Sequence, residues 1–420
     1  MNAPTALPAG NGATLSDPDD PVVITGTGLV SALGCDAAAA LASIAAGGSG
    51  IATVESFTRP ARAALVREFT PTDYVAKAKL RRMDPLNVFA IGAATQALAM
   101  AGLDEAGRLG CGAVVGSGFA GYRSVVEHQK KLVRDGIRTL SPIHFPTTVY
   151  NATAGLLAIE LQVLGPNSTV TGVDASGEHA LYYAATLLAR GQCEQILAIG
   201  ADELSPALFD GFDALGLLER DTTRSPLPFG RERHGFAPGE GAAALLLERE
   251  STARARGATI LGRLLGFGFA NGASTPFAHN PDPALIATAA TEALGRARLT
   301  AGQIDWCSAS ACGSPTRDAA EAAGLASLFA AHGTPLRALK AWTGEYAASG
   351  IQRLLLGLHA ARLGALPAMP AGDYLPEVAP LLAADCAAPR RCLHLGTGVG
   401  GNTVAIVVEA AATGRDREAA

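Results

Sequence analysis

The stretch Val22-Val-Ile-Thr-Gly-Thr-Gly-Leu-Val-Ser-Ala-Leu-Gly34 sets the pattern that the rest of the chain repeats. Its start, residues 22–25, is apolar and β-branched, which predicts a short buried strand. The sequence Gly26-Thr27-Gly28 follows directly and predicts a tight turn from the strand into a helix, because glycine adopts backbone conformations that other residues avoid. A dinucleotide-binding loop needs a third glycine where this chain has Ser31, so the turn is the favoured interpretation.

Strand-like and Ala-rich helical segments alternate along the rest of the chain. Further strands are predicted at residues 112–115, 169–173, 195–200, 242–248, 260–266, 305–308, 393–395 and 403–408. Helices are predicted at residues 36–46, 85–101, 152–162, 178–190, 283–298, 318–330 and 345–363. This alternation predicts an α/β fold with mostly parallel sheets covered by helices. The order recurs after residue 260, which favours two similar halves.

Composition narrows the classes of function. The 420 residues are 49% hydrophobic and 17% charged, which excludes a mainly disordered chain. The net charge of −5 gives no basic surplus for nucleic-acid binding. No apolar run reaches the ~20 residues of a membrane helix, and we expect no membrane association. Seven cysteines without a CxxC pair predict neither a disulfide framework nor a zinc site, and they fit a reducing cytoplasm.

Three local patterns are candidates for a site, and each has an ordinary explanation as well. Asp174 precedes a predicted helix, where a nucleophile would gain from the helix dipole; an N-cap is the favoured reading. The cluster Gly396-Thr-Gly-Val-Gly-Gly-Asn402 either approaches a ligand or lines a crowded core. Lys340 and Glu345 can pair across Gly344, although charges near turns are commonly just solvated.

An ordered series of segments resembles the β-ketoacyl-ACP synthase family, the condensing enzymes of fatty-acid and polyketide synthesis. Besides residues 22–34, the series comprises Arg82-Met-Asp84, Gly116-Ser-Gly118, residues 151–155, Gly165-Pro-Asn167, residues 229–241 and residues 398–402. The resemblance implies a thiolase-like, duplicated α/β fold with five layers (α-β-α-β-α), usually in a dimer. We expect a flexible segment at residues 1–20, the two halves at 21–258 and 259–412, and a flexible tail at 413–420.

That family works with one cysteine and two histidines, and the resemblance places other residues at all three positions. The acyl-carrying cysteine position matches Asp174. The first histidine lies in a stretch that usually reads Asn-Ala-His-Gly-Thr-Ser-Thr-Pro; this chain has Ser308-Ala-Ser-Ala-Cys-Gly-Ser-Pro315, with Ser310 at the histidine position. The second follows Thr-Gly after a lysine, where Lys340-Ala-Trp-Thr-Gly-Glu345 supplies Glu345.

The resemblance also assigns supporting positions. Asp318, Glu321 and Lys340 fall on the family's acidic and lysine positions, and we expect them to form a buried ionic network. The expected acyl and pantetheine channel consists of Cys312, Ser314, Gly398, Val399 and Gly400, with Val399 in the place of a gating phenylalanine. Cys312 stands where the family has a threonine; it is the thiol near the site, but no histidine remains to activate it. No cofactor and no metal are expected.

The substitutions point to a protein that does not condense. An acyl-Asp174 would be a fragile anhydride, and Ser310 with Glu345 cannot reproduce an imidazole pair. Losing one preorganised donor costs about 10²–10³ in rate, and here the nucleophile is lost as well. The hypothesis is a chain-length-factor-like subunit that pairs with an active ketosynthase in fatty-acid or polyketide synthesis, including polyene pigments.

Two alternatives stay open at the level of sequence. The chain could be an acyl-ACP-dependent acyltransferase or hydrolase that uses Asp174 or Glu345 as a general base. It could also be a homodimeric scaffold that binds acyl-ACP without reaction. The expected partners are an active ketosynthase, or a second copy of the chain, and acyl carrier protein with its acyl-phosphopantetheine.

Overall fold

The computed structural model describes residues 20–140, 142, 145–275 and 282–412. The two expected flexible ends, apart from Asp20, lie outside this range. Within the described residues the strands form one ten-stranded sheet and a two-stranded ribbon of β2 and β3. The strands are β1 (Val22–Ser31), β2 (Ala52–Val54), β3 (Ala61–Ala63), β4 (Gly112–Gly116), β5 (Asn167–Val170), β6 (Gln195–Asp202), β7 (Gly241–Arg249), β8 (Gly262–Asn271), β9 (Trp306–Ser308), β10 (Leu336–Arg337), β11 (Arg391–Thr397) and β12 (Asn402–Ala410).

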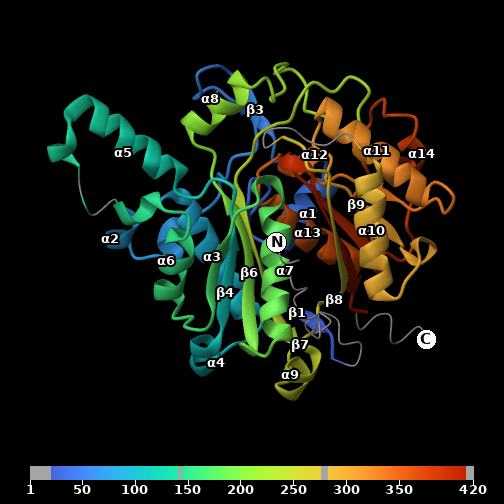
Figure 1. The fold of residues 1–420 in the computed structure, drawn as a ribbon, viewed down its shortest axis with the longest axis horizontal. Helices are drawn as coiled ribbons and strands as arrows, with labels where there is room; N and C mark the ends of the chain where they lie inside the picture. Colours follow the sequence, from blue (N-terminus) through green and yellow to red (C-terminus); the bar gives the residue numbers. More distant parts are fainter. Residues whose placement is uncertain (1–19, 141, 143–144, 276–281, 413–420) are drawn as a thin grey trace, which may run out of the picture.

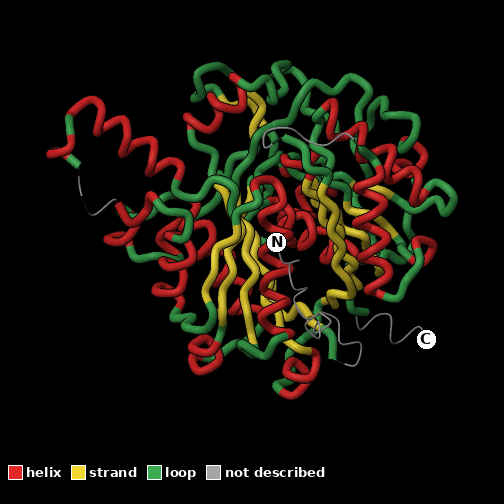
Figure 2. The backbone as a smooth tube through the Cα atoms, in the orientation of Figure 1, coloured by secondary structure: helices red, strands yellow, loops and turns green. Residues whose placement is uncertain are grey.

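The ten-stranded sheet is built from two halves of the same topology. The first half has the strand order β1-β7-β6-β4-β5, and the second has β8-β12-β11-β9-β10. In each half, therefore, the first strand along the chain lies beside the fifth, then the fourth, the second and the third. The halves meet where residues 22–24 of β1 pair with residues 262–264 of β8, and Figure 2 shows the two groups of strands diverging from there. The predicted duplication is confirmed. The prediction of mostly parallel sheets is wrong, because five of the nine strand pairs in this sheet are antiparallel.

Helices complete five layers (Figure 1). The α-helices are α1 (Ala37–Ala45), α2 (Lys77–Leu80), α3 (Pro85–Met100), α4 (Glu105–Gly110), α5 (Tyr122–Asp135), α6 (Ala152–Leu161), α7 (Ser176–Ala189), α8 (Pro206–Ala214), α9 (Glu250–Ala255), α10 (Ala284–Ala297), α11 (Pro315–Phe329), α12 (Lys340–Thr343), α13 (Ser349–Arg362) and α14 (Ala379–Ala383). The 3-10 turns are η1 (Pro71–Asp73), η2 (Ile137–Thr139), η3 (Phe145–Thr148), η4 (Val173–Ala175), η5 (Ala301–Gln303) and η6 (Val399–Gly401). Helices α7 and α13 pack on each other between the two sheet halves, α3 and α6 cover the outer face of the first half, and α10 and α11 cover that of the second. This agrees with the expected five-layer fold.

The predicted turn at Gly26-Thr27-Gly28 is wrong, because β1 continues without a break to Ser31. The two glycines instead let helix α3 lie directly on the strand. A Cβ atom at Gly26 would come 2.1 Å from the carbonyl oxygen of Ala97, and one at Gly28 would come 1.9 Å from that of Ala93. The motif therefore serves close helix-on-strand packing, a common reason for glycine inside a strand.

Two predicted boundaries near the site also differ from the structure. The predicted helix at 345–363 begins at Ser349, because the backbone of Glu345 is held elsewhere: its N–H donates to Ala237 and its carbonyl accepts from Gly239. The predicted strand at 169–173 ends at Val170. Val173 has a φ of 50°, a strained value for a β-branched residue, and lies in η4.

Two features are absent from the described residues. None of their helices is both long enough and apolar enough to cross a lipid bilayer. None of their histidine, cysteine and acidic side chains gather in a group of three or more that could hold a metal ion.

Candidate functional site

The candidate site lies where loops leave the carboxyl ends of the strands. Ser310 follows β9, Thr397 ends β11, and Asp174 lies in η4 just before α7. Glu345 lies in the loop between α12 and α13. The fold thus brings Asp174, Ser310 and Glu345 from both halves to one place. The carboxyl ends of strands are where α/β sheets usually bind their ligands.

Arg317 is the centre of this group, and it was not among the residues expected from the sequence. Its side chain is 4% exposed although it carries a charge. Nη2 donates to the Ser310 hydroxyl at 2.7 Å, and Nε donates to the Thr397 hydroxyl at 2.8 Å. Nη1 lies 3.3 Å from the Glu345 carboxylate and 3.8 Å from that of Asp174. One guanidinium therefore links all three positions that the resemblance assigns to cysteine and histidine.

Lys340 adds a second buried cation. Its Nζ lies 2.5 Å from Oε2 of Glu345 and 3.5 Å from the Ser310 hydroxyl. Both members of the Lys340–Glu345 pair are buried. The two residues therefore form a buried ion pair, and not the solvated charges that their position near a turn had also allowed. Burial lowers the pKa of Lys340, Arg317 lowers it further, and Glu345 opposes both.

The charges of the group balance. Arg317 and Lys340 face Asp174 and Glu345, which gives two cations and two carboxylates. Burial lowers the pKa of Arg317, but the neighbouring Glu345, Cys312 and Asp174 raise it above its ordinary value. A guanidinium that stays charged in this way neutralises the carboxylates without any ligand, because buried charges are tolerated when they are paired.

Asp318 and Glu321 act on the loop rather than as ion-pair partners of Lys340. Asp318 accepts backbone N–H groups of Phe229, Cys312 and Gly313 at 2.9–3.0 Å. Glu321 accepts the backbone N–H of Ser310 at 2.5 Å. Burial raises the pKa of Glu321 to about 7, although the Ser310 N–H opposes this. The two acids fix the loop that carries Ser310 and Cys312.

Asp174 does not cap helix α7, as local spacing had favoured. The N-cap residue is Ala175, and it makes no side-chain capping bond. The Cβ of Asp174 instead packs 3.5 Å from the position that a Cβ on Gly398 would occupy, and its carboxylate faces Arg317. Asp174 is therefore turned toward the group of charges.

Cys312 and the glycine-rich loop form the rim. The Cys312 sulfur is buried, 4.0 Å from Nη1 of Arg317, and burial raises the pKa of its thiol well above the usual range. Ser314 is the N-cap residue of α11, while Gly398, Val399 and Gly400 lie in or beside η6. A small cavity beside Arg317 runs along this loop; its volume is about 20 Å³, room for roughly one water molecule.

A second buried ionic group lies in the central helical layer. Glu178 of α7 accepts from Arg353 of α13 at 2.8 Å and lies 3.3 Å from Nε2 of His394 on β11. A Cβ at Gly396 would come 2.5 Å from Oε1 of Glu178. Of the two explanations for the glycine-rich cluster, a crowded core therefore applies at Gly396. Burial lowers the pKa of His394 to about 4, so the ring is neutral and Arg353 supplies the positive charge.

Comparison with known proteins identifies the family. The model of the β-ketoacyl synthase N-terminal domain matches residues 19–253, and that of the C-terminal domain matches residues 261–372. The chain belongs to the β-ketoacyl synthase family. A 3-oxoacyl-[acyl-carrier-protein] synthase 2 of Vibrio harveyi is 32% identical to this synthase homologue over 316 residues, which cover 72% of this chain and 76% of the relative.

Solved structures agree with the family. The structure described as the ishigamide ketosynthase/chain length factor superposes with a TM-score of 0.85 at 25% identity, covering 93% of this chain and 99% of that one. A β-ketoacyl synthase from Burkholderia phymatum gives a TM-score of 0.84 at 27% identity, covering 93% of this chain and 100% of that one. The chain is thus similar to β-ketoacyl synthases and also to a structure described as a ketosynthase/chain length factor.

Proposed function

We propose that this β-ketoacyl synthase homologue is a non-condensing, chain-length-factor-type subunit that pairs with an active ketosynthase in fatty-acid or polyketide synthesis. One observation carries the proposal. The positions that the family resemblance gives to the cysteine and the two histidines hold Asp174, Ser310 and Glu345, and Arg317 contacts all three.

The contacts leave these residues unsuited to acyl transfer. A covalent route needs a nucleophile with a base beside it. Here the Ser310 hydroxyl accepts from Arg317, while Glu345 is held by Lys340 at 2.5 Å and by Arg317 at 3.3 Å. Both contacts are made to Oε2 of Glu345, so this oxygen is engaged inside the protein and is not turned toward a substrate.

The surface of the first half supports a partner subunit. Strand β5 is at one end of the ten-stranded sheet and pairs with β4. Beside it, the elements α5, η2, η3 and α6 pack together, and α5 projects from the body (Figure 1). Their exposed apolar side chains include Val133 at 85%, Ile137 at 75% and Ile159 at 70%. We call this region the apolar shoulder. An edge strand with exposed apolar side chains on the neighbouring elements is the kind of surface that proteins bury against a partner.

In this proposal, acyl carrier protein delivers its acyl chain to the partner ketosynthase. The rim residues Cys312, Ser314, Gly398, Val399 and Gly400 are the proposed wall of the pantetheine and acyl channel. The growing chain would be bound covalently by the ketosynthase, and this subunit would shape the space into which it extends.

The experiment is co-expression of the chain with a ketosynthase that carries the cysteine and both histidines. Native mass spectrometry is expected to show a stable one-to-one complex, and the chain is expected to alter product length. Ile159→Asp in the shoulder is expected to weaken this complex. Its matched control is Leu363→Asp, because Leu363 is 73% exposed but lies at the end of α13, away from the shoulder. Recovery of the chain as a homodimer alone, with no effect on product, would contradict the proposal.

A subunit that uses Asp174 or Glu345 as a base for acyl hydrolysis or transfer is the alternative. The contacts favour it less, since both carboxylates face Arg317. Turnover of acyl-ACP by the purified chain, lost in Asp174→Asn and Glu345→Gln, would support it instead.

A further inference from the structure

A second cavity among the described residues lies at the other end of the sheets, where β1 and β8 begin. Its volume is about 590 Å³, within the usual range of ligand pockets of about 300–1,000 Å³. It is lined by Asp20, Pro21, Glu250, Ser251, Arg254, Arg263, Leu265, Arg296, Ala297 and Arg298. The candidate site lies at the opposite, carboxyl ends of the strands, so the two do not share residues.

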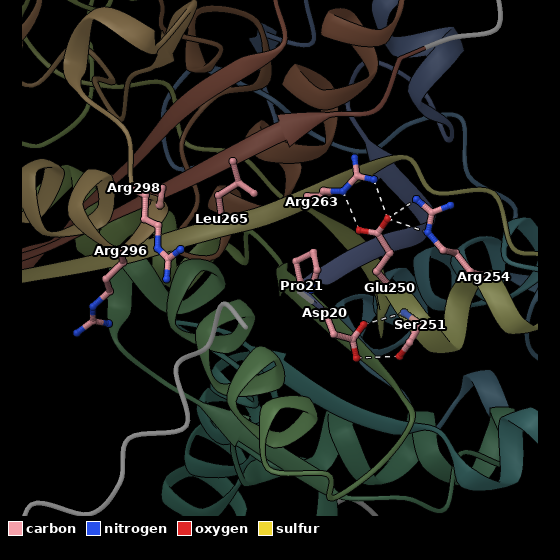
Figure 3. A pocket seen from close by; sticks show the side chains of 10 residues that line it. Asp20, Pro21, Glu250, Ser251, Arg254, Arg263, Leu265, Arg296 and Arg298 are labelled. Atoms are coloured by element: carbon pink, nitrogen blue, oxygen red, sulfur yellow. Dashed lines mark hydrogen bonds and ion pairs between the residues drawn. The ribbon is translucent and has the colours of Figure 1, made fainter. Parts of the chain in front are cut away.

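One side of the cavity is a fixed ionic arrangement. Arg263 donates to both carboxylate oxygens of Glu250 at 2.8 Å, and Arg254 donates to Oε1 of the same residue. Two guanidiniums share the Glu250 carboxylate, and with the Asp20 carboxylate on the same side the charges here balance. Asp20 has both oxygens bonded to Ser251, at 2.7 Å to the backbone N–H and 2.8 Å to the hydroxyl. Figure 3 shows these bonds on one side of the cavity.

The other side is formed by the end of helix α10. Figure 3 shows Arg298 and Arg296 there, with Leu265 and Pro21 between them and the Glu250 group. Arg296 is paired with Glu292 at 2.6 Å. Within the described part of the chain, by contrast, the Arg298 side chain has no hydrogen bond or ion pair. Its backbone has a φ of 56°, fixed by its N–H bond to Gly295, so the residue is held at the cavity although its side chain is not engaged.

We propose that this cavity binds a small organic phosphate. Arg298 lies across it from the Glu250 group, to which Arg263 and Arg254 are bonded, and guanidinium groups bind phosphate oxygens with charge-assisted hydrogen bonds. The four arginines outnumber the two carboxylates of the lining, in a chain whose overall net charge is −5. Leu265, Pro21 and Ala297 supply an apolar wall for an organic portion. The site is independent of the function proposed above.

The test titrates inorganic pyrophosphate and, separately, ADP into the full-length chain at low salt, with calorimetry as the readout. Saturable one-to-one binding of both is expected, with ADP the tighter because its organic part contacts the apolar wall. Arg298→Gln is expected to weaken both about tenfold, the typical effect of one charge-assisted bond. The matched control is Arg296→Gln, which also removes one positive charge from the lining and is expected to change affinity less than about twofold.

The outcomes separate cleanly. Equal weakening in Arg298→Gln and Arg296→Gln would mean general attraction to positive charge, and unchanged affinity in Arg298→Gln would place the ligand elsewhere; either result overturns the proposal. Binding of pyrophosphate without ADP would contradict the organic part, and no saturable binding of either would contradict the site. Melting temperatures of both variants report whether each is folded, and Arg298→Glu, which should abolish binding, gives a second variant at the same position.

Discussion

The two halves of the molecule have the same strand order but differ in the segment between their second and third strands. In the second half a single helix, α11, connects β9 to β10. In the first half the connection from β4 to β5 contains α5, η2, η3 and α6, and these carry the apolar shoulder. The second half in turn provides most of the candidate site, including Ser310, Arg317, Lys340 and Glu345, while the first provides Asp174.

This difference shows how a duplicated fold divides its tasks. The sheets and their core helices repeat, whereas the connections at the strand ends have specialised: one toward a paired set of buried charges, the other toward an exposed surface. Connections vary more readily than the elements they join, because fewer packing contacts constrain them. Substitutions at the buried charges of the second half should therefore affect stability, and those in the shoulder should affect association.

The largest expected effect is that of Arg317→Met. It leaves the carboxylates of Asp174 and Glu345 with one cation fewer in a buried site, and breaking a buried pair typically costs about 3–5 kcal/mol. The measurement is the free energy of unfolding in urea. The first half supplies the control, Lys130→Met, whose partner Glu127 and own side chain are both more than 60% exposed; its effect should stay within about 0.5 kcal/mol. Equal losses of unfolding free energy in Arg317→Met and Lys130→Met would contradict the stabilising role of the buried charges.

The second prediction concerns pH. The pKa of Glu321 is about 7 in the folded chain, against an ordinary value of 4.5. Between these values the folded state holds a proton that the unfolded state has released, so stability is full below pH 4.5 and falls as pH rises toward 7. The loss from a fully buried group of this kind is about 3 kcal/mol.

Glu321→Gln removes this titration while its amide oxygen can still accept the Ser310 N–H. We therefore expect a flatter dependence of unfolding free energy on pH between 4.5 and 7 than in the parent chain. The exposed Glu377→Gln should reproduce the parent's slope. An unchanged slope in Glu321→Gln would show that Glu321 is ionised throughout.

Substitutions in the apolar shoulder should change the affinity for the partner and not the stability of the chain. Ile159→Asp places a charge on its exposed apolar surface and should weaken binding to the ketosynthase partner about tenfold to a hundredfold, with the unfolding free energy unchanged. Surface-immobilised partner and a concentration series of each variant give the affinity. Should Leu363→Asp weaken the complex as much as Ile159→Asp, the shoulder is not the interface.

The smallest effect is expected at Cys312. Burial raises the pKa of its thiol, and Arg317 opposes this only in part. Iodoacetamide at pH 8 should therefore modify the part-exposed Cys386 before Cys312, as read by peptide mass spectrometry, and Cys312→Ser should leave complex formation unchanged. Preferential labelling of Cys312 would contradict this and indicate a reactive thiol at the site.

Local sequence signals predicted most of the fold, and the family resemblance supplied three positions of the candidate site, but neither showed what holds these positions together. Apolar runs and ordered motifs predicted the duplicated α/β architecture. Arg317 escaped notice because its partners Glu345 and Thr397 are 28 and 80 positions away, so no spacing rule joins them. The pair Glu178–Arg353, separated by 175 positions, was missed for the same reason. A charged residue beside Asp318 in the first turn of an inward-packing helix was the one available signal.

The glycines of β1 teach a related lesson. A Gly-x-Gly sequence after an apolar run predicts a turn when it is considered alone. Here the glycines are required because the carbonyl oxygens of Ala93 and Ala97, far along the chain, pack directly against them. Tertiary packing decided between two uses of the same residue type.

The central claim is that the charge-balanced group around Arg317 cannot carry out condensation. Its most direct measurement incubates the purified chain alone with acyl-ACP and malonyl-ACP and searches for β-ketoacyl-ACP by mass spectrometry. The account predicts no product from the chain alone and product when the ketosynthase partner is added. Product formed by the chain alone, and lost in Glu345→Gln, would contradict it.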